Sequence, residues 1–200
     1  MPDKRTEAFP CVGPKVPRRR YGFVEVVGRL ILGTLGWRVE GAIPDVPRLV
    51  AVFAPHSSNW DFVITISVMV ALRLRANFVA KHTLFRGPLG AFIHWLGGIP
   101  VDRKRPEGFV DAMIGEFAKQ EQLWLTLAPE GTRTPRGSYK SGFYRIAQQA
   151  GVPILPVFLN YKAKVLGFLP PVYPNTLLED GVAAIRDLLA GHGARRSGKP

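Results

Sequence analysis

Cysteine and long apolar runs are almost absent from this 200-residue sequence. Cys11 has no second cysteine with which to form a disulfide within the chain, so a reducing compartment is the simplest prediction. Beyond the N-terminal region, the longest apolar run covers residues 62–72, well short of the roughly 20 residues of a membrane-spanning helix. The first 20 residues mix both charges with several prolines and lack the apolar core of a secretory leader. We therefore expect neither a spanning helix nor export.

Acidic residues are also scarce, because 15 Asp and Glu stand against 27 Lys and Arg and leave a formal net charge of +12. Residues 1–20 and 195–200 together hold +7 of this charge, and the chain between them holds the other +5. Basic tails of this kind suit an anionic membrane or a nucleic acid, because both present phosphates to Lys and Arg. Solvated tails without a partner are the alternative.

The segment 21–37 directly follows the basic N-terminal tail and is apolar apart from Glu25, Arg29 and Thr34. It is too short and too interrupted to cross a bilayer, but its pattern suits an amphipathic helix that lies at a membrane interface. A helix packed on the protein core has the same pattern, so both interpretations stay open.

From Arg48 onward, short β-branched runs alternate with longer helical stretches. This pattern is typical of repeated βα units, so we predict one α/β domain with a mostly parallel central sheet flanked by helices. The predicted strands are Leu49–Ala54, Asn77–Ala80, Leu123–Leu127 and Ile154–Leu159, and the predicted helices are Asn59–Arg75, Leu84–Leu96, Glu107–Gln120, Gly142–Ala150 and Leu177–Ala190. The predicted organisation is a basic tail at 1–20, an amphipathic membrane-interface helix at 21–37, the α/β domain at 38–190 and a second basic tail at 191–200.

A histidine and an aspartate are spaced as HxxxxD where the first predicted strand ends. His56 lies in the predicted turn, and Asp61 lies where the next helix begins. A carboxylate that holds one imidazole nitrogen leaves the other nitrogen to act as a general base. The spacing alone is weak evidence, because Asp61 or Ser58 could simply cap the helix.

A second polar turn, Ala128–Thr134, follows the third predicted strand. Arg133 offers a planar guanidinium suited to a phosphate, and Glu130 could orient it or hold a second basic group. A surface turn with an ion pair is the alternative. The same two interpretations apply to Asp102 and Arg103, which follow a predicted turn and strand at 97–101.

Several catalytic motifs are missing from the sequence. It contains no GxSxG elbow, HExxH, CxxC pair, GxGxxG or GxxxxGK[ST] phosphate loop. Cys11 lies in a polar stretch and is badly placed to act as a nucleophile. We therefore predict that His56 and Asp61 activate a hydroxyl for direct attack, without a metal or a bound cofactor, in acyl transfer, phosphoryl transfer or hydrolysis.

Four sequence blocks occur in one order: HxxxxD at 56–61, a Pro/Gly turn ending in IPVDR, PEGTR at 129–133 and VPILPV at 152–157. Together they resemble the glycerolipid acyltransferase family of 1-acylglycerol-3-phosphate acyltransferases. The resemblance implies that 38–190 is an acyltransferase domain, in which His56 is the base on the acceptor hydroxyl and Asp61 supports it. It also implies an acceptor site in the second and third blocks and an acyl-donor site in the fourth. The substrate-binding residues implied are Lys81, Arg103, Glu130, Gly131, Thr132, Arg133 and Lys140.

The same resemblance implies a cellular setting and partners. The family acts at the cytoplasmic face of the membrane and uses acyl-CoA or acyl-carrier protein without a metal. We therefore expect a peripheral or monotopic protein at the cytoplasmic face of the cell membrane that converts 1-acylglycerol-3-phosphate to phosphatidate. The expected partners are an anionic membrane surface, the lyso-lipid acceptor and the acyl carrier.

Three alternatives stay open. Ala128 replaces an aromatic residue often found before PEGTR, and the four residues between His56 and Asp61 are unusual for the first block. The acceptor could therefore be another lyso-lipid such as an aminolipid. A lipid hydrolase could use His56 to activate water. A basic membrane- or nucleic-acid-binding protein without catalysis would explain the tails but not the four blocks. Nucleic acid is disfavoured, because the aromatic side chains fall inside apolar stretches.

Overall fold

One central sheet organises the structure, a computed structural model that describes residues 9–56, 58–101, 108–130, 139–175 and 177–193. Within these ranges, seven strands form the sheet in the order β1-β7-β6-β2-β5-β3-β4. Their bounds are Arg38–Glu40 (β1), Arg48–Ala54 (β2), Ala76–Lys81 (β3), Gly98–Val101 (β4), Leu123–Leu127 (β5), Ile154–Asn160 (β6) and Val165–Phe168 (β7). Neighbouring strands are parallel except β6 and β7, which form an antiparallel hairpin. The predicted α/β domain with a mostly parallel sheet is confirmed.

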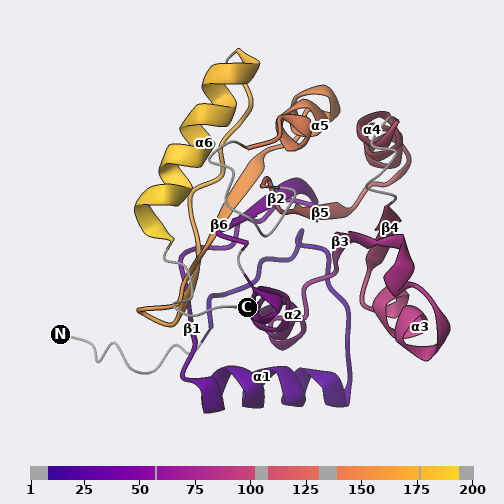
Figure 1. The fold of residues 1–200 in the computed structure, drawn as a ribbon, viewed down its shortest axis with the longest axis vertical. Coiled ribbons are helices and arrows are strands. Elements are labelled where there is room, and N and C mark those ends of the chain that lie inside the picture. The colour runs from indigo at the N-terminus through magenta and orange to yellow at the C-terminus, as the bar shows by residue number, and fades with distance from the viewer. Residues whose placement is uncertain (1–8, 57, 102–107, 131–138, 176, 194–200) are drawn as a thin grey trace.

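Helices cover both faces of the sheet: α1, α2 and α3 lie on one side, and α4, α5 and α6 lie on the other (Figure 1). Their bounds are Phe23–Leu35 (α1), Asn59–Ala71 (α2), Gly87–Trp95 (α3), Phe109–Lys119 (α4), Gly142–Ala150 (α5) and Leu178–His192 (α6), with a short 3-10 turn, η1, at His82–Leu84. Side chains alternate along β2, so Leu49 and Ala51 join the first core while Val50 and Val52 join the second. Because both faces are buried, the strand is a continuous apolar run.

Some predicted boundaries are wrong, for local backbone reasons. The helix predicted over 59–75 ends at Ala71, because Arg73 adopts a left-handed φ of 58° and Leu74 pairs with Arg18 in an isolated bridge. The helix predicted over 84–96 is two elements, because Gly87 has a φ of 62° and α3 begins there. Strands β1 and β7 were not predicted. They have three and four residues, too few to show a periodic pattern.

The amphipathic segment 21–37 forms α1, which packs on α2 with one face. Glu25, Gly28 and Leu32 are the buried residues of the helix. A β-carbon on Gly28 would lie 2.5 Å from a methyl group of Val70, so the two helices approach closely at this glycine. One face of α1 therefore packs on the protein core, as the second interpretation of the sequence expected. The opposite face of α1 is available for another contact. No helix in the described part of the chain is long and apolar enough to cross a membrane.

Part of the basic N-terminal segment is held against the domain. Val16 is buried, and the backbone N–H of Arg19 donates to the carbonyl of Arg73 at 2.9 Å. The Arg19 guanidinium donates to the carbonyl of Trp95 at 2.6 Å and lies over the Trp95 ring, 5.0 Å from its centroid. The cation of Arg19 thus has a structural partner, so residues 16–19 are part of the folded domain.

Glu25 anchors the start of α1 and carries a testable pH dependence. Its pKa lies below its ordinary value, first because the backbone N–H of Tyr21 donates to it at 2.7 Å, and then because Arg73 Nε donates at 2.7 Å. A carboxyl whose pKa is lowered by folding stabilises the fold above its unfolded pKa, near 4.5, and loses that contribution as pH falls through the lower folded pKa.

We expect Glu25→Gln to lower stability at pH 7 and to reduce the loss of stability between pH 6 and pH 3. Urea unfolding midpoints at several pH values measure both effects. Glu121→Gln, at an exposed position, is the matched control and should keep the wild-type pH dependence. Equal acid sensitivity of the wild type and Glu25→Gln would contradict the assignment.

Candidate active site

Two strand exits meet at the carboxyl edge of the sheet. Strands β2 and β5 are adjacent and parallel, with Val52 paired to Leu127, so the chain leaves both at the same edge. His56 lies two residues after β2, and Glu130 lies three residues after β5. Open α/β sheets bind their ligands at this edge. The position is therefore that of a candidate site.

Asp61 closes the first turn of α2 through a capping box. Ser58 is the N-cap: its Oγ accepts from the backbone N–H of Trp60 at 3.2 Å, and its own N–H donates to Asp61 Oδ2 at 2.7 Å. The Asp61 side chain is fully buried, and the helix N-terminus favours its negative charge. The capping role that the sequence left as an alternative is therefore real. It also fixes where the carboxylate lies.

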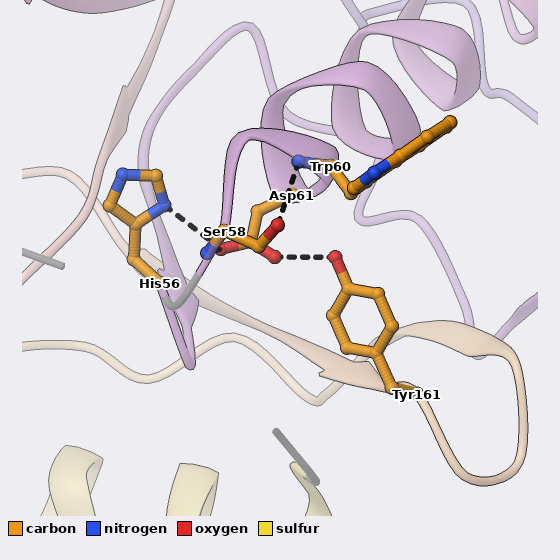
Figure 2. Close-up of polar contacts among 5 residues, drawn as sticks. All are labelled: His56, Ser58, Trp60, Asp61 and Tyr161. Atoms are coloured by element: carbon orange, nitrogen blue, oxygen red, sulfur yellow. Dashed lines mark hydrogen bonds and ion pairs between the residues drawn. The ribbon is translucent and has the colours of Figure 1, made fainter. Parts of the chain in front are cut away.

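His56 faces the same carboxylate (Figure 2). Its Nδ1 lies 3.3 Å from Asp61 Oδ2, in ion-pair range, although no acceptor in the described residues is aligned for a hydrogen bond with Nδ1. The ring packs edge-on against Phe53, with centroids 5.3 Å apart, and 15% of the side chain is exposed. Figure 2 shows the other nitrogen, Nε2, pointing away from Asp61. The structure thus brings His56 and Asp61 together with one ring nitrogen directed outward.

A third side chain reaches Asp61 from a position that the sequence did not single out. Tyr161 directly follows β6, and its hydroxyl donates to Asp61 Oδ1 at 2.5 Å (Figure 2). Strand β6 is the other neighbour of β2 and is parallel to it, so Tyr161 is at a third exit on the same edge. The sequence carries a signal for the strand exit, because a polar side chain follows an apolar strand here as it does at His56 and Glu130. It carries no local signal for the contact with Asp61, which depends on β6 lying beside β2.

The predicted acceptor-binding residues lie only partly within the described chain. Lys81 is the exposed last residue of β3, which is parallel to β5. The backbone N–H of Lys140 donates to the carbonyl of Pro129 at 2.9 Å, which places Lys140 beside the exit of β5 that carries Glu130. Lys81, Glu130 and Lys140 therefore share the edge of the sheet with His56. Arg103, Gly131, Thr132 and Arg133 lie outside the described residues.

The site has the chemistry of a proton-transfer pair. An imidazole with one nitrogen toward a buried carboxylate and the other directed outward is suited to take a proton from a hydroxyl. In the described ranges, no three His, Cys, Asp or Glu side chains gather as metal ligands would. Fold and site together define an α/β protein with a His–Asp pair at the carboxyl edge of its sheet.

The chain belongs to the Acyltransferase family, whose family model matches residues 38–160. The match includes the HxxxxD, PEGTR and VPILPV blocks and confirms the resemblance. The 1-acyl-sn-glycerol-3-phosphate acyltransferase alpha of Mus musculus is 30% identical over 157 residues, which are 68% of this chain and 54% of that protein. This chain therefore spans about half the length of that relative. The 1-acyl-sn-glycerol-3-phosphate acyltransferase of Salmonella typhimurium is 28% identical, over 88% of this chain and 78% of that protein.

A solved structure has the same fold. The crystal structure of the 1-acyl-sn-glycerophosphate (LPA) acyltransferase PlsC from Thermotoga maritima aligns with a TM-score of 0.61. The alignment covers 86% of this chain and 80% of that chain at 22% sequence identity, so it shows a shared fold.

Proposed function

We propose that the protein transfers a fatty acyl group from acyl-CoA or acyl-carrier protein to the hydroxyl of 1-acylglycerol-3-phosphate and forms phosphatidate. The observation that carries the proposal is the His56–Asp61 pair at the sheet edge, with Nδ1 and Oδ2 3.3 Å apart, in a member of the Acyltransferase family. The names of the mouse and Salmonella relatives support the acceptor, because both are 1-acyl-sn-glycerol-3-phosphate acyltransferases.

His56 is the general base in this proposal. The Asp61 carboxylate, with Oδ2 3.3 Å from Nδ1, would favour a proton on Nδ1, which leaves the lone pair of Nε2 to take the proton of the acceptor hydroxyl. The hydroxyl oxygen attacks the thioester carbonyl, a C–O bond forms and the C–S bond breaks. The imidazolium then returns the proton to the departing thiolate. The buried carboxylate stabilises the imidazolium between these two steps.

Cationic side chains at neighbouring strand exits would hold the phosphate of the acceptor. Lys81 and Lys140 share the sheet edge with His56, and Arg103 and Arg133 lie in the IPVDR and PEGTR blocks. A phosphate accepts charge-assisted hydrogen bonds from such groups, and the guanidinium of an arginine can donate two parallel hydrogen bonds to two phosphate oxygens. The proposal needs no metal and no bound cofactor, because the acyl carrier enters as a substrate.

We expect Arg103→Ala and Arg133→Ala each to raise the KM for 1-acylglycerol-3-phosphate about 10- to 150-fold. The range corresponds to the loss of one hydrogen bond to a charged group, about 1.5 to 3 kcal/mol. Initial rates at varied acceptor concentration measure KM and kcat separately. Arg145→Ala, at an exposed position of α5, is the matched control. A fall in kcat with KM unchanged in both variants would count against a phosphate site.

The proposed acceptor lies in a lipid bilayer, and α1 offers a surface for attachment. Phe23, Val26 and Leu30 are exposed on the helix face opposite to its buried residues. Apolar side chains at an interface, together with nearby Lys and Arg, bind an anionic membrane without crossing it. We propose that the protein is peripheral at the cytoplasmic face of the membrane, with this face of α1 in contact with lipid.

The decisive assay for the proposed function uses purified protein, a panel of lyso-lipids, and radiolabelled acyl-CoA or acyl-carrier protein as donor. Labelled phosphatidate from 1-acylglycerol-3-phosphate is the expected product. If the acyl group is transferred only to a different lyso-lipid, the proposed acceptor is wrong but the protein is still an acyltransferase. Release of labelled free fatty acid without any ester product would identify a hydrolase and overturn the proposal.

A further inference from the structure

The hydroxyl of Tyr161 meets the carboxylate of Asp61 across a separation of 100 residues. It donates to Oδ1 at 2.5 Å, whereas the N–H of Ser58 donates to Oδ2 at 2.7 Å. The two oxygens of the carboxylate are thus held by donors from two different parts of the chain. His56 Nδ1 faces Oδ2, the oxygen that Ser58 holds.

Tyr161 is itself held in place from two sides. Its ring packs edge-to-face on Trp37, just beyond the end of α1, with centroids 5.0 Å apart. The turn that carries it is braced by Asn160, whose Oδ1 accepts from the N–H of Ala163 at 2.9 Å and whose Nδ2 donates to the carbonyl of His192 at 3.1 Å. The phenol is therefore a prearranged donor rather than a mobile surface group.

Strand pairing fixes this donor relative to His56. Strand β6 lies directly beside β2, with Phe158 paired to Ala54, so Tyr161 and His56 leave neighbouring strands at one edge. Figure 2 shows the Tyr161 hydroxyl on one side of the Asp61 carboxylate and Ser58 on the other. Two donors on opposite oxygens restrict rotation of the carboxylate about its Cβ–Cγ bond.

We propose that Tyr161 is a positioning residue for the acyl-transfer reaction. Its hydroxyl fixes the orientation of the Asp61 carboxylate so that Oδ2 faces His56. This inference rests on the proposed function, in which His56 is the base. An imidazole is an effective base when a carboxylate fixes its tautomer and ring orientation, and a second-layer donor that aligns the carboxylate improves that fixation. Because Tyr161 acts through Asp61 in this proposal, its contribution should appear in turnover rather than in acceptor binding.

The test is Tyr161→Phe, which removes only the hydroxyl and keeps the ring on Trp37. We expect kcat to fall about 10-fold or more, as for a lost hydrogen bond to a charged group, with the KM for 1-acylglycerol-3-phosphate changed by less than about twofold. Tyr173→Phe is the matched control and should leave kcat unchanged. Tyr173 is exposed and follows Val172, which bridges to Ile154 at the opposite end of β6 from Tyr161. Melting temperatures confirm that the variants are folded at the assay temperature.

A double-mutant cycle separates positioning from a general structural role. In an Asp61→Ala background, Tyr161→Phe should lower kcat by less than about twofold, because the side-chain oxygen to which the Tyr161 hydroxyl donates is gone, whereas Asn would keep such an oxygen. Equal effects of Tyr161→Phe in the two backgrounds, or an unchanged kcat in the single variant, would overturn the inference. A His56→Ala protein with wild-type turnover would instead overturn the proposed function, so the two failures are distinguishable.

Discussion

Replacing His56 with alanine is expected to lower kcat by about 10³-fold or more while the protein stays folded. General base catalysis contributes roughly 10²- to 10⁴-fold, and the substitution also removes the imidazole that the Asp61 carboxylate faces. The His56 ring is mostly buried against Phe53 but contributes no hydrogen bond in capping α2, so the fold should tolerate its removal. The measurement is initial-rate kinetics with 1-acylglycerol-3-phosphate and a labelled acyl donor.

The matched control for this experiment is His94→Ala. His94 is an exposed histidine on α3 whose ring packs against Phe85, with centroids 4.7 Å apart, and it has no contact with Asp61 in the described structure. Its removal should leave kcat within about twofold of the wild type. Circular dichroism and a thermal melt establish that both variants are folded. Wild-type turnover by a folded His56→Ala protein would refute the base assignment.

Replacing Phe23, Val26 and Leu30 together with serine is expected to weaken binding to anionic vesicles about 100-fold or more. The three side chains are exposed to 77%, 50% and 59%. Each would gain on the order of 1 kcal/mol on entering a lipid interface, and about 1.4 kcal/mol corresponds to a tenfold change in affinity. Sedimentation with phosphatidylglycerol-containing vesicles measures the partition. High salt should release the wild-type protein only partly, because it screens the basic residues and not the apolar contact.

Leu177→Ser is the matched control for the membrane experiment. Leu177 is also 77% exposed, but it precedes α6, on the other side of the sheet from α1. The control should bind vesicles as the wild type does. Truncation of residues 1–37 is a poor substitute, because Glu25, Gly28 and Leu32 are buried and their removal would uncover α2. Equal vesicle binding by the triple variant and the wild type would show that α1 is not the attachment surface.

Sequence patterns predicted the helices and strands that are determined by residues close together in the chain. The strand Leu123–Leu127 and the helix Gly142–Ala150 have the predicted bounds, because a buried apolar run and an amphipathic period are visible within a few residues. The short pairing of β1 with β7 depends on neighbours 127 residues apart, such as Arg38 and Val165, and so has no local signal.

The residues of the candidate site likewise fall into those that a local pattern predicted and those that it did not. His56 and Asp61 were predicted together because a single turn and the start of one helix bring them close. Tyr161 was missed because its approach to Asp61 depends on which strand lies beside β2, and the order of strands in a sheet is not visible in any one segment. The structural role of Arg19 was missed for a related reason, since its partner is the carbonyl of Trp95 at the end of α3.

The double role of Asp61 has a consequence for heat inactivation. The ends of helices fray more readily than their centres, and opening the first turn of α2 would break the bond from the N–H of Ser58 and swing the carboxylate away from His56. The residues of this turn take no part in the strand pairing of the sheet. In a site built this way, activity depends on the fraction of molecules in which one turn of helix is closed. Catalysis should therefore decline on warming before the domain unfolds, and the hydroxyl of Tyr161 is a contact from outside the helix that opposes this loss.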